Sequence, residues 1–308
     1  IALIIVLIFG VNVAGGLDVV IDNAKALPGY LSMVQSYDVA SGTASPYRLL
    51  TILSTLAWGL GYFGMPHILL RFMAIEEEEK LTLSRRIAII WVVISMAVAV
   101  FIGVIGYSMS KAGAIDVLEG SNSETIIVRI ADLLSRHGVI CALLAGIILA
   151  GILASTMSTA DSQLLAASSA VSSDMLNRNG KSGIIAARIT LMLIAVFAVI
   201  LARNPNSSVF QIVSFAWAGF GAAFGPVVLF SLFWRRTNKY GALAGMLSGG
   251  VVIFVWKYLV RPLGGIWNIY ELLPAFIVAC VAIVVFSLAT PAPDQSILDE
   301  FDRAASGK

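Results

Sequence analysis

Residues 58–72 read WGLGYFGMPHILLRF and lie within an apolar stretch that runs from about residue 47 to residue 73. That stretch is long enough to cross a bilayer, which takes about 20 apolar residues. Yet Gly59, Gly61, Gly64 and Pro66 fall within eight residues. Each glycine destabilises a helix by about 1 kcal/mol, and a proline destabilises it by about 3 kcal/mol. Proline also removes a backbone donor and disfavours helical geometry at Met65. The helix is therefore predicted to break here.

A broken helix at membrane depth frees backbone N–H and C=O groups that lipid does not satisfy, so such backbone is packed in protein or lines a wet cavity. Secondary transporters bind their substrates at discontinuous helices of this kind. A kink that serves only helix packing is the alternative, because glycine and proline are both common in membrane helices. The stretch by itself leaves both interpretations open.

The composition of the chain is that of a polytopic membrane protein. Of its 308 residues, 59% are hydrophobic and 12% are charged, whereas soluble domains contain about 25% charged residues. The net charge of +2 indicates no nucleic-acid partner. Cys141 and Cys280 stand inside apolar segments, where free thiols are ordinary, so neither a disulfide nor a metal site is predicted.

The predicted fold class is an all-α membrane protein with about eight transmembrane segments. The chain begins at Ile1 inside the first apolar run, which we interpret as the end of a truncated span. Residues 290–308 are predicted to form a cytoplasmic tail after a partial transporter domain of residues 1–289. Apolar residues in 124–136 have helical spacing, which predicts a helix along the membrane surface or over the protein. The eight apolar segments are residues 1–14, 47–73, 87–110, 139–171, 184–202, 209–234, 242–260 and 269–289.

Lysine and arginine in short loops indicate orientation, because cytoplasmic loops are richer in them. One side of the predicted topology carries more of these residues, although the long loop of residues 111–138 adds three to the other side. The richer side and the C-terminus are therefore placed in the cytoplasm, with the protein in the cytoplasmic membrane. The residues of that side are Lys80, Arg85, Arg86, Arg178, Lys181, Arg235, Arg236, Lys239, Arg303 and Lys308.

No catalytic constellation is present in the sequence, so the protein is not expected to be an enzyme. His67 and His137 are its only histidines, and neither has a serine or carboxylate partner at a suitable spacing. A phosphate-binding P-loop is also absent, so this sequence does not encode ATP-driven transport. The chemistry that remains is binding and release of a polar solute or an ion.

Hydroxyl side chains are dense in residues 151–163, which read GILASTMSTADSQ. Ser155, Ser158, Thr159 and Ser162 follow three- and four-residue spacing and share a helix face. Oxygen atoms of this kind suit Na⁺, but serine-rich faces also mediate helix packing, and spacing alone favours packing. Asp161 is a candidate functional residue, because acids inside membrane segments are costly; the alternative is a position near the membrane surface, since Asp174 and Arg178 follow soon after.

Small and aromatic residues alternate in residues 214–226, which read SFAWAGFGAAFGP. Gly221 and Gly225 form a GxxxG pair, which favours close approach of two helices. This pattern predicts a packing and hinge role rather than direct contact with a substrate.

At these three stretches the sequence resembles the sodium/solute symporter family. The resemblance implies a leucine-transporter-like inverted-repeat fold of about thirteen spans, of which this chain would hold the second repeat and the C-terminal helices. The matching words are WGLGYFGMPHILLRFMA, GILASTMSTADSQLLAASSA and VSFAWAGFGAAFGPVVLFSLFWRR, followed by GALAGM and IVVFSL.

The resemblance also implies a sodium site on the helix that carries the Met-Ser-Thr word. Its ligands in this chain would be the hydroxyls of Ser158 and Thr159 and the backbone carbonyl of Ser155. Further ligands would come from the first repeat, which is missing from this sequence.

For the substrate, the resemblance implies a site at the broken helix, formed by Trp58, Tyr62 and Pro66 with backbone groups near Gly59 and Gly61. An aromatic wall would suit the pyrrolidine ring of L-proline, and free backbone groups would meet its charged ends. The implied function is sodium-coupled uptake of L-proline by alternating access. Symport of another amino acid, a sugar or a carboxylate, a transporter-like membrane sensor, and a channel remain alternatives.

Overall fold

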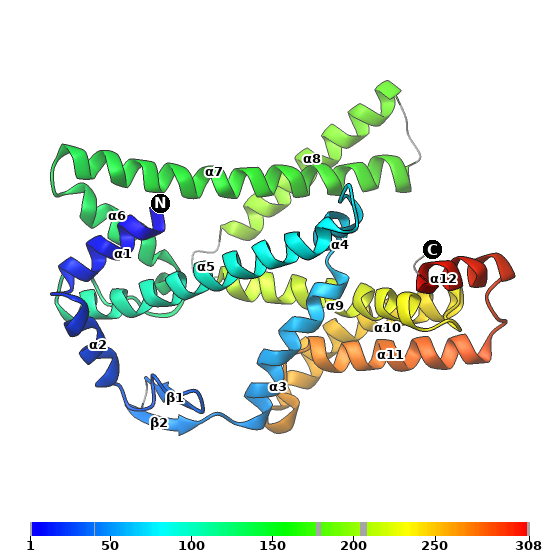
Figure 1. Ribbon diagram of the computed structural model, residues 1–308, viewed down its shortest axis with the longest axis horizontal. Coiled ribbons are helices and arrows are strands. Elements are labelled where there is room, and N and C mark those ends of the chain that lie inside the picture. Colours follow the sequence, from blue (N-terminus) through cyan, green and yellow to red (C-terminus); the bar gives the residue numbers. More distant parts are fainter. Residues whose placement is uncertain (1, 40, 177–179, 204–207, 307–308) are drawn as a thin grey trace. The chain divides into compact units, whose positions relative to one another are not determined.

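The computed structural model describes residues 2–39, 41–176, 180–203 and 208–306 (Figure 1). These residues are predominantly helical and form two compact units. Residues 1–31 and 89–209 form the first unit, and residues 32–88 and 210–308 form the second. Arg178 and Lys308, which enter the charge argument, lie outside the described residues.

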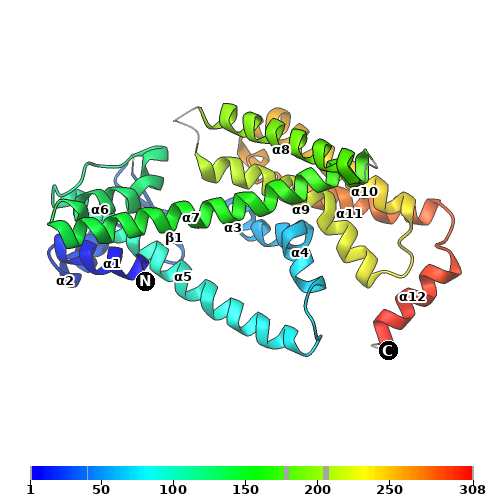
Figure 2. The same ribbon diagram turned by 90° about the horizontal axis from the view of Figure 1, so that it is seen from above.

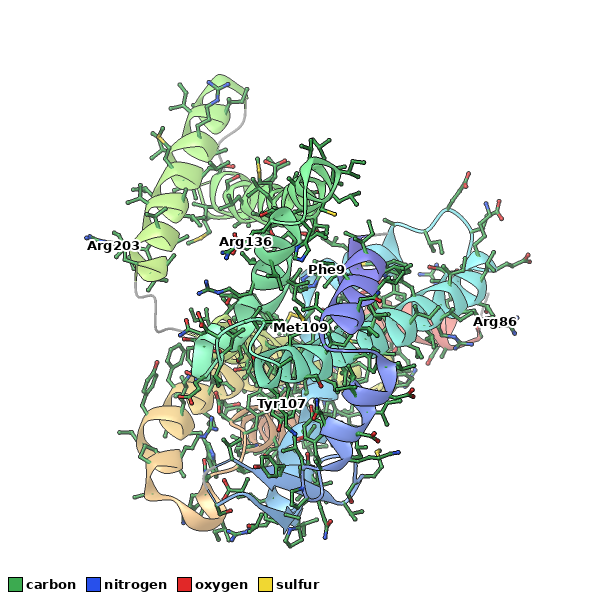
Figure 3. All side chains as sticks on the ribbon, turned by 90° about the vertical axis from the view of Figure 1, so that its left-hand side faces the viewer. Phe9, Arg86, Tyr107, Met109, Arg136 and Arg203 are labelled. Carbon is green, nitrogen blue, oxygen red and sulfur yellow. The ribbon has the colours of Figure 1, made fainter. Side chains whose placement is uncertain are left out.

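The first unit is built from helices around one apolar core. Side chains from α1, α5, α6 and α7 meet in it, and Val6, Ile105, Met109 and Ile130 are fully buried there (Figure 3 labels Met109). The helical spacing predicted for residues 124–136 is confirmed by α6, whose buried residues Ile130, Ala131 and Leu134 pack in this core. The elements are α1 (Ala2–Val13), α2 (Leu17–Lys25), α5 (Lys80–Lys111, from residue 89 on), η2 (Gly120–Thr125), α6 (Ile126–Ser135), α7 (Val139–Ser169), the π-helical turn η3 (Ala170–Met175) and α8 (Gly180–Ala202).

The second unit holds the broken helix and the last long helices of the chain. Its core gathers Ala57 from α3, Ala218 and Ala222 from α9, and Leu272 and Ala275 from α11. The elements are β1 (Gln35–Asp38), β2 (Thr43–Pro46), α3 (Leu49–Ala57), η1 (Trp58–Gly64), α4 (Pro66–Met73), α9 (Val209–Phe233), α10 (Lys239–Val255), η4 (Trp256–Val260), η5 (Arg261–Leu263), η6 (Gly265–Trp267), α11 (Leu272–Ala289) and α12 (Gln295–Ser306).

α10 and α11 run along each other in the second unit (Figure 2). Gly241, Gly245 and Gly249 recur at four-residue spacing and are buried on one face of α10. A Cβ at Gly241 or Gly245 would collide with Ser287 or Ile283 of α11, and one at Gly249 would collide with the backbone of α9. The missing side chains therefore allow the helix backbones to come into direct contact.

The loop after α9 ties the ends of α10, α11 and α12 together. The Asn238 side chain caps α10 by accepting a hydrogen bond from the Gly241 N–H at 2.9 Å. Its amide also donates to the Pro291 carbonyl at 2.7 Å. Arg235 forms two hydrogen bonds with the Asp302 carboxylate, at 2.9 and 2.8 Å.

Six of the described helices are long and apolar enough to cross a membrane, and the bent pair α1 and α2 makes a seventh if counted as one span. The all-α multi-pass architecture predicted from the sequence is confirmed. The sequence count of about eight is higher because it includes residues 47–73. α3 and η1 together, Leu49–Gly64, are apolar but too short to qualify.

Two regions contain structure that the sequence patterns did not indicate. Residues 15–46, which lie between the first two predicted apolar segments, contain helix α2 and an antiparallel strand pair in which Gln35 faces Pro46 and Asp38 faces Thr43. Residues 290–308, expected to form a tail, contain helix α12.

Candidate functional site

The predicted break in the helix of residues 47–73 is confirmed. The α-helix α3 ends at Ala57, and the chain continues as the 3-10 helix η1 to Gly64. Met65 is extended, with φ −83° and ψ 112°, and Pro66 begins α4 at its first position. Proline is favoured there because its missing N–H and fixed φ suit the first turn of a helix. The α-helical hydrogen-bond ladder is therefore interrupted over this segment.

Glycines allow η1 to lie directly against α9. Gly61 and Gly64 are buried, and a Cβ at Gly64 would collide with the Phe220 carbonyl of α9. In the reverse direction, a Cβ at Gly221 would lie 2.7 Å from the Cα of Gly61. The close helix approach that the GxxxG pair predicted is thus confirmed, and its partner is the broken helix.

Trp58 lies at the centre of an aromatic stack in the second unit. Its ring stacks on those of Phe210, Trp217 and Tyr270, with centroids 5.5, 5.7 and 5.9 Å away. Its backbone carbonyl accepts a hydrogen bond from the Trp217 Nε1–H at 3.0 Å. Both the side chain and the backbone carbonyl of Trp58, the first residue of the 3-10 segment, are therefore held by tertiary contacts.

Tyr62, one turn further along, is the more accessible of the two predicted aromatic residues. Its side chain is 51% exposed, and its ring meets that of Trp217 edge to face, with centroids 4.8 Å apart. Trp217 therefore supports one side of the Tyr62 ring, while the rest of the ring remains accessible to a ligand. Gly59 and Pro66 are exposed on either side of it.

Tyr270 and Trp217 were not singled out from the sequence as site residues. The Tyr270 hydroxyl donates to the Ser214 carbonyl of α9 at 2.6 Å, and its N–H donates to the Ser54 Oγ of α3 at 3.1 Å. Burial raises the pKa of Tyr270, which keeps the hydroxyl protonated as a donor. Tyr270 lies in an irregular connection without periodicity, so only its aromatic character signalled a buried role.

The predicted sodium ligands lie on α7 in the first unit. Thr159 Oγ1 donates to the Ser155 carbonyl at 3.1 Å, so two of the three predicted oxygen atoms are adjacent. Ser158 lies between them in sequence, and all three residues are exposed. Uncharged oxygen donors of this kind fit a hard cation such as Na⁺. Among the described residues, no group of three or more His, Cys, Asp or Glu side chains forms a metal site.

The site residues predicted from the sequence thus form two separate sets. Trp58, Gly61 and Tyr62 come together around Trp217 in the second unit. Ser155, Ser158 and Thr159 occupy a single helix of the first unit. The predicted substrate residues therefore belong to the second unit, and the predicted sodium ligands belong to the first.

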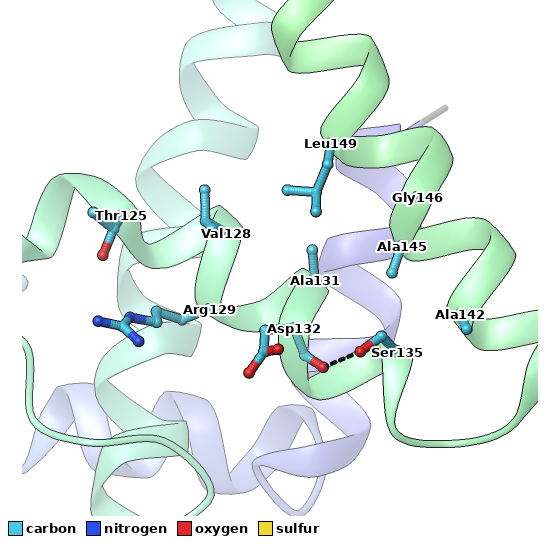
Figure 4. Close-up of a pocket in the computed structure, with 10 residues that line it drawn as sticks. All are labelled: Thr125, Val128, Arg129, Ala131, Asp132, Ser135, Ala142, Ala145, Gly146 and Leu149. Carbon is cyan, nitrogen blue, oxygen red and sulfur yellow. Dashed lines mark hydrogen bonds between the residues drawn. The ribbon is translucent and has the colours of Figure 1, made fainter.

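A hollow of about 620 Å³ lies between α6 and α7 in the first unit (Figure 4). Thr125, Arg129, Asp132 and Ser135 contribute its polar groups. The Ser135 hydroxyl donates to the Asp132 carbonyl at 2.6 Å. Asp132 also pairs with Arg136 at 2.6 Å. None of the predicted site residues lines this hollow.

Comparison with known proteins identifies relatives of the chain. The family model for the sodium:solute symporter family matches residues 1–249. The chain is 43% identical over 262 residues to the sodium/proline symporter of Haemophilus influenzae, covering 83% of this chain and 51% of that protein.

Two further relatives show similar coverage. The chain is 38% identical over 282 residues to the sodium/proline symporter of Escherichia coli, covering 88% of this chain and 53% of the relative. It is 38% identical over 251 residues to the osmoregulated proline transporter OpuE of Bacillus subtilis, covering 80% and 49%. The chain spans about half the length of these curated relatives. With most of its length matched by the family model and a broken helix at the matching word, the chain belongs to the sodium:solute symporter family.

Proposed function

We propose that the protein is a secondary active transporter that couples the entry of Na⁺ to the uptake of L-proline across the cytoplasmic membrane by alternating access. The observation that carries this proposal is the broken helix, where a half-exposed tyrosine borders an aromatic stack and an interrupted backbone. The relatives named as proline transporters support proline as the solute.

In this proposal proline binds beside η1. The face of Tyr62 and the edge of Trp58 cover the apolar pyrrolidine ring, and backbone groups near Gly59 and Gly61 meet the carboxylate and the ammonium. Pro66 ends the 3-10 segment and keeps Met65 extended, which leaves backbone groups outside the helical ladder for this purpose.

Na⁺ binds the oxygen atoms of Ser155, Ser158 and Thr159 on α7. Binding of the ion replaces the Thr159 to Ser155 hydrogen bond with two ion contacts. Coupling is reciprocal, so Na⁺ raises the affinity for proline by the same factor as proline raises the affinity for Na⁺. The C-terminal helix α12 lies on the cytoplasmic side.

The test is uptake of radiolabelled proline into proteoliposomes that contain the full-length protein. Accumulation that requires an inward Na⁺ gradient, saturates, and resists competition by other amino acids is the expected result. Flux that saturates with proline and requires Na⁺ excludes a channel. Failure to accumulate proline under the gradient contradicts proline as the solute, and a screen of other labelled solutes would identify the alternative.

A further inference from the structure

Trp217 of α9 contacts the broken helix in three ways. Its Nε1–H donates to the Trp58 carbonyl at 3.0 Å, its ring stacks on Trp58 at 5.7 Å, and the ring of Tyr62 meets it edge to face at 4.8 Å. A Cβ at Gly61 would collide with the indole of Trp217. One side chain therefore touches the backbone, a half-buried ring and an exposed ring of the same segment.

These contacts come from one face of α9. Trp217, Gly221 and Gly225 follow four-residue spacing. The two glycines bring the backbone of η1 against α9, as the collisions of a Cβ at Gly64 and Gly221 show. Trp217 then fills the space beside Gly61, and η1 has little freedom to turn about its own axis.

The hydrogen bond also has a specific role at the start of η1. Trp58 begins the 3-10 segment, where the pattern of backbone hydrogen bonds changes. A carbonyl that accepts an indole N–H is fixed in direction, and so are the peptide groups that follow it. The orientation of the Gly59–Gly61 backbone and of the Tyr62 ring therefore depends on Trp217.

We infer that Trp217 is a positioning residue of the substrate site, which sets the backbone of η1 and the ring of Tyr62 for proline without being a ligand itself. This inference rests on the proposed function. It adds a residue from α9, a helix for which the sequence pattern predicted only packing and a hinge.

The experiment measures equilibrium binding of labelled proline at saturating Na⁺, together with uptake kinetics, for the protein as its gene encodes it. The variants are Trp217→Ala, Trp217→Phe and the control Trp234→Ala. Trp234 directly follows the same helix and has its own ring contact, with Phe230 at 5.5 Å. All values are normalised to the amount of folded protein.

Trp217→Ala is expected to raise the Kd and apparent KM for proline about tenfold, because it removes a hydrogen bond and two ring contacts, with a smaller change in the maximal rate. Trp217→Phe keeps a ring but lacks the N–H, so it should recover much of the affinity, with a rise of about threefold remaining. Trp234→Ala should bind proline like the wild type. If Trp217→Ala does not fold, the threefold rise in Trp217→Phe decides the question.

A double variant separates positioning from general destabilisation. Because Trp217 acts partly through Tyr62 and partly through the η1 backbone, the Tyr62→Ala/Trp217→Ala protein should lose less proline affinity than the product of the two single effects. Effects that multiply independently, or an unchanged KM with a reduced maximal rate, would overturn the inference. A wild-type protein that neither binds nor accumulates proline would instead refute the proposed function, and this is measured before any variant is made.

Discussion

The broken helix η1 and the hydroxyl face of α7 both place polar groups in apolar helical segments, but these groups have different partners. At η1, the Trp58 carbonyl and the glycine backbone are met by α9, a helix more than 140 residues further along the chain. On α7, the hydroxyls of Thr156, Thr159 and Ser162 donate to carbonyls four residues earlier in their own helix. The first arrangement is held by tertiary packing, whereas the second is local.

This difference has a physical consequence. A hydroxyl that bonds back to its own helix can exchange that bond for an ion without moving the backbone. A 3-10 segment clamped between glycines cannot change one contact without disturbing the others, because packed interiors leave little free volume. We therefore expect substitutions at η1 and α9 to affect folding and solute affinity together, and substitutions on α7 to affect only the ion.

The largest effect is expected at the glycine contact. Gly221→Ala should lower the free energy of unfolding by about 1–3 kcal/mol through overpacking, since its Cβ would lie 2.7 Å from the Gly61 Cα and 3.0 Å from Leu272. Uptake should fall with it. Thermal unfolding in detergent and proline uptake measure both effects.

Gly219→Ala is the matched control, since it lies on the same helix with nothing within 4 Å of its added Cβ. Both changes gain the same intrinsic helix propensity, so only the packing differs. Equal stability of the two variants would contradict the close contact between η1 and α9.

Tyr62→Ala is expected to raise the apparent KM for proline by about tenfold, because it removes the exposed ring that borders the proposed pocket. Tyr62→Phe should retain most of the affinity if the ring rather than the hydroxyl covers the solute. Uptake kinetics at saturating Na⁺ distinguish the two. Kinetics of Tyr62→Ala that match the wild type would place the pocket elsewhere.

On α7, Thr159→Ala is expected to raise the Na⁺ concentration needed for half-maximal uptake by about tenfold, since a lost ligand to a charged group costs about 1.5–3 kcal/mol. Stability should change little, because the side chain is exposed. Thr156→Ala is the control, as Thr156 also donates to a carbonyl four residues earlier, that of Ile152 at 2.9 Å. The same Na⁺ dependence in both variants would remove Thr159 from the sodium site.

The smallest effect is expected at α12. The Arg235 guanidinium lowers the pKa of Asp302, so the pair stabilises the docked helix above the ordinary carboxyl pKa. That stabilisation is lost as the pH falls through the lowered pKa. Both side chains are about half exposed, and exposed pairs contribute little. Asp302→Asn should leave proline uptake within about twofold while making α12 easier to cleave by limited proteolysis near neutral pH. Unchanged cleavage would show that the pair does not hold the helix.

Sequence reasoning succeeded where the cause was local. Pro66 and its neighbouring glycines have low helix propensity, and this local cause made the change from α3 to η1 predictable, although α9 continues through three glycines and Pro226. It identified Gly221 and Gly225 as a contact surface but not their partner, because the GxxxG pattern carries no information about the opposite helix. The hydrogen bond from Trp217 to Trp58 joins residues 159 positions apart, and no local spacing indicates such a pairing. The helix α12 was missed because its only marked feature, one apolar face, is short and lies among prolines and acids.

The row of buried glycines on α10, Gly241, Gly245 and Gly249, limits how α10 can slide along α11. The backbone of α10 at Gly241 and Gly245 lies directly against Ser287 and Ile283 of α11, so α10 places no side chain of its own between the two helices there. A shift by one whole turn would bring Ile283 against Gly241 or Gly249, which continue the four-residue spacing, so only a shift by a fraction of a turn takes Ile283 off the glycines. Shear by a fraction of a turn is therefore costly, and we expect α10 and α11 to move together as one rigid pair.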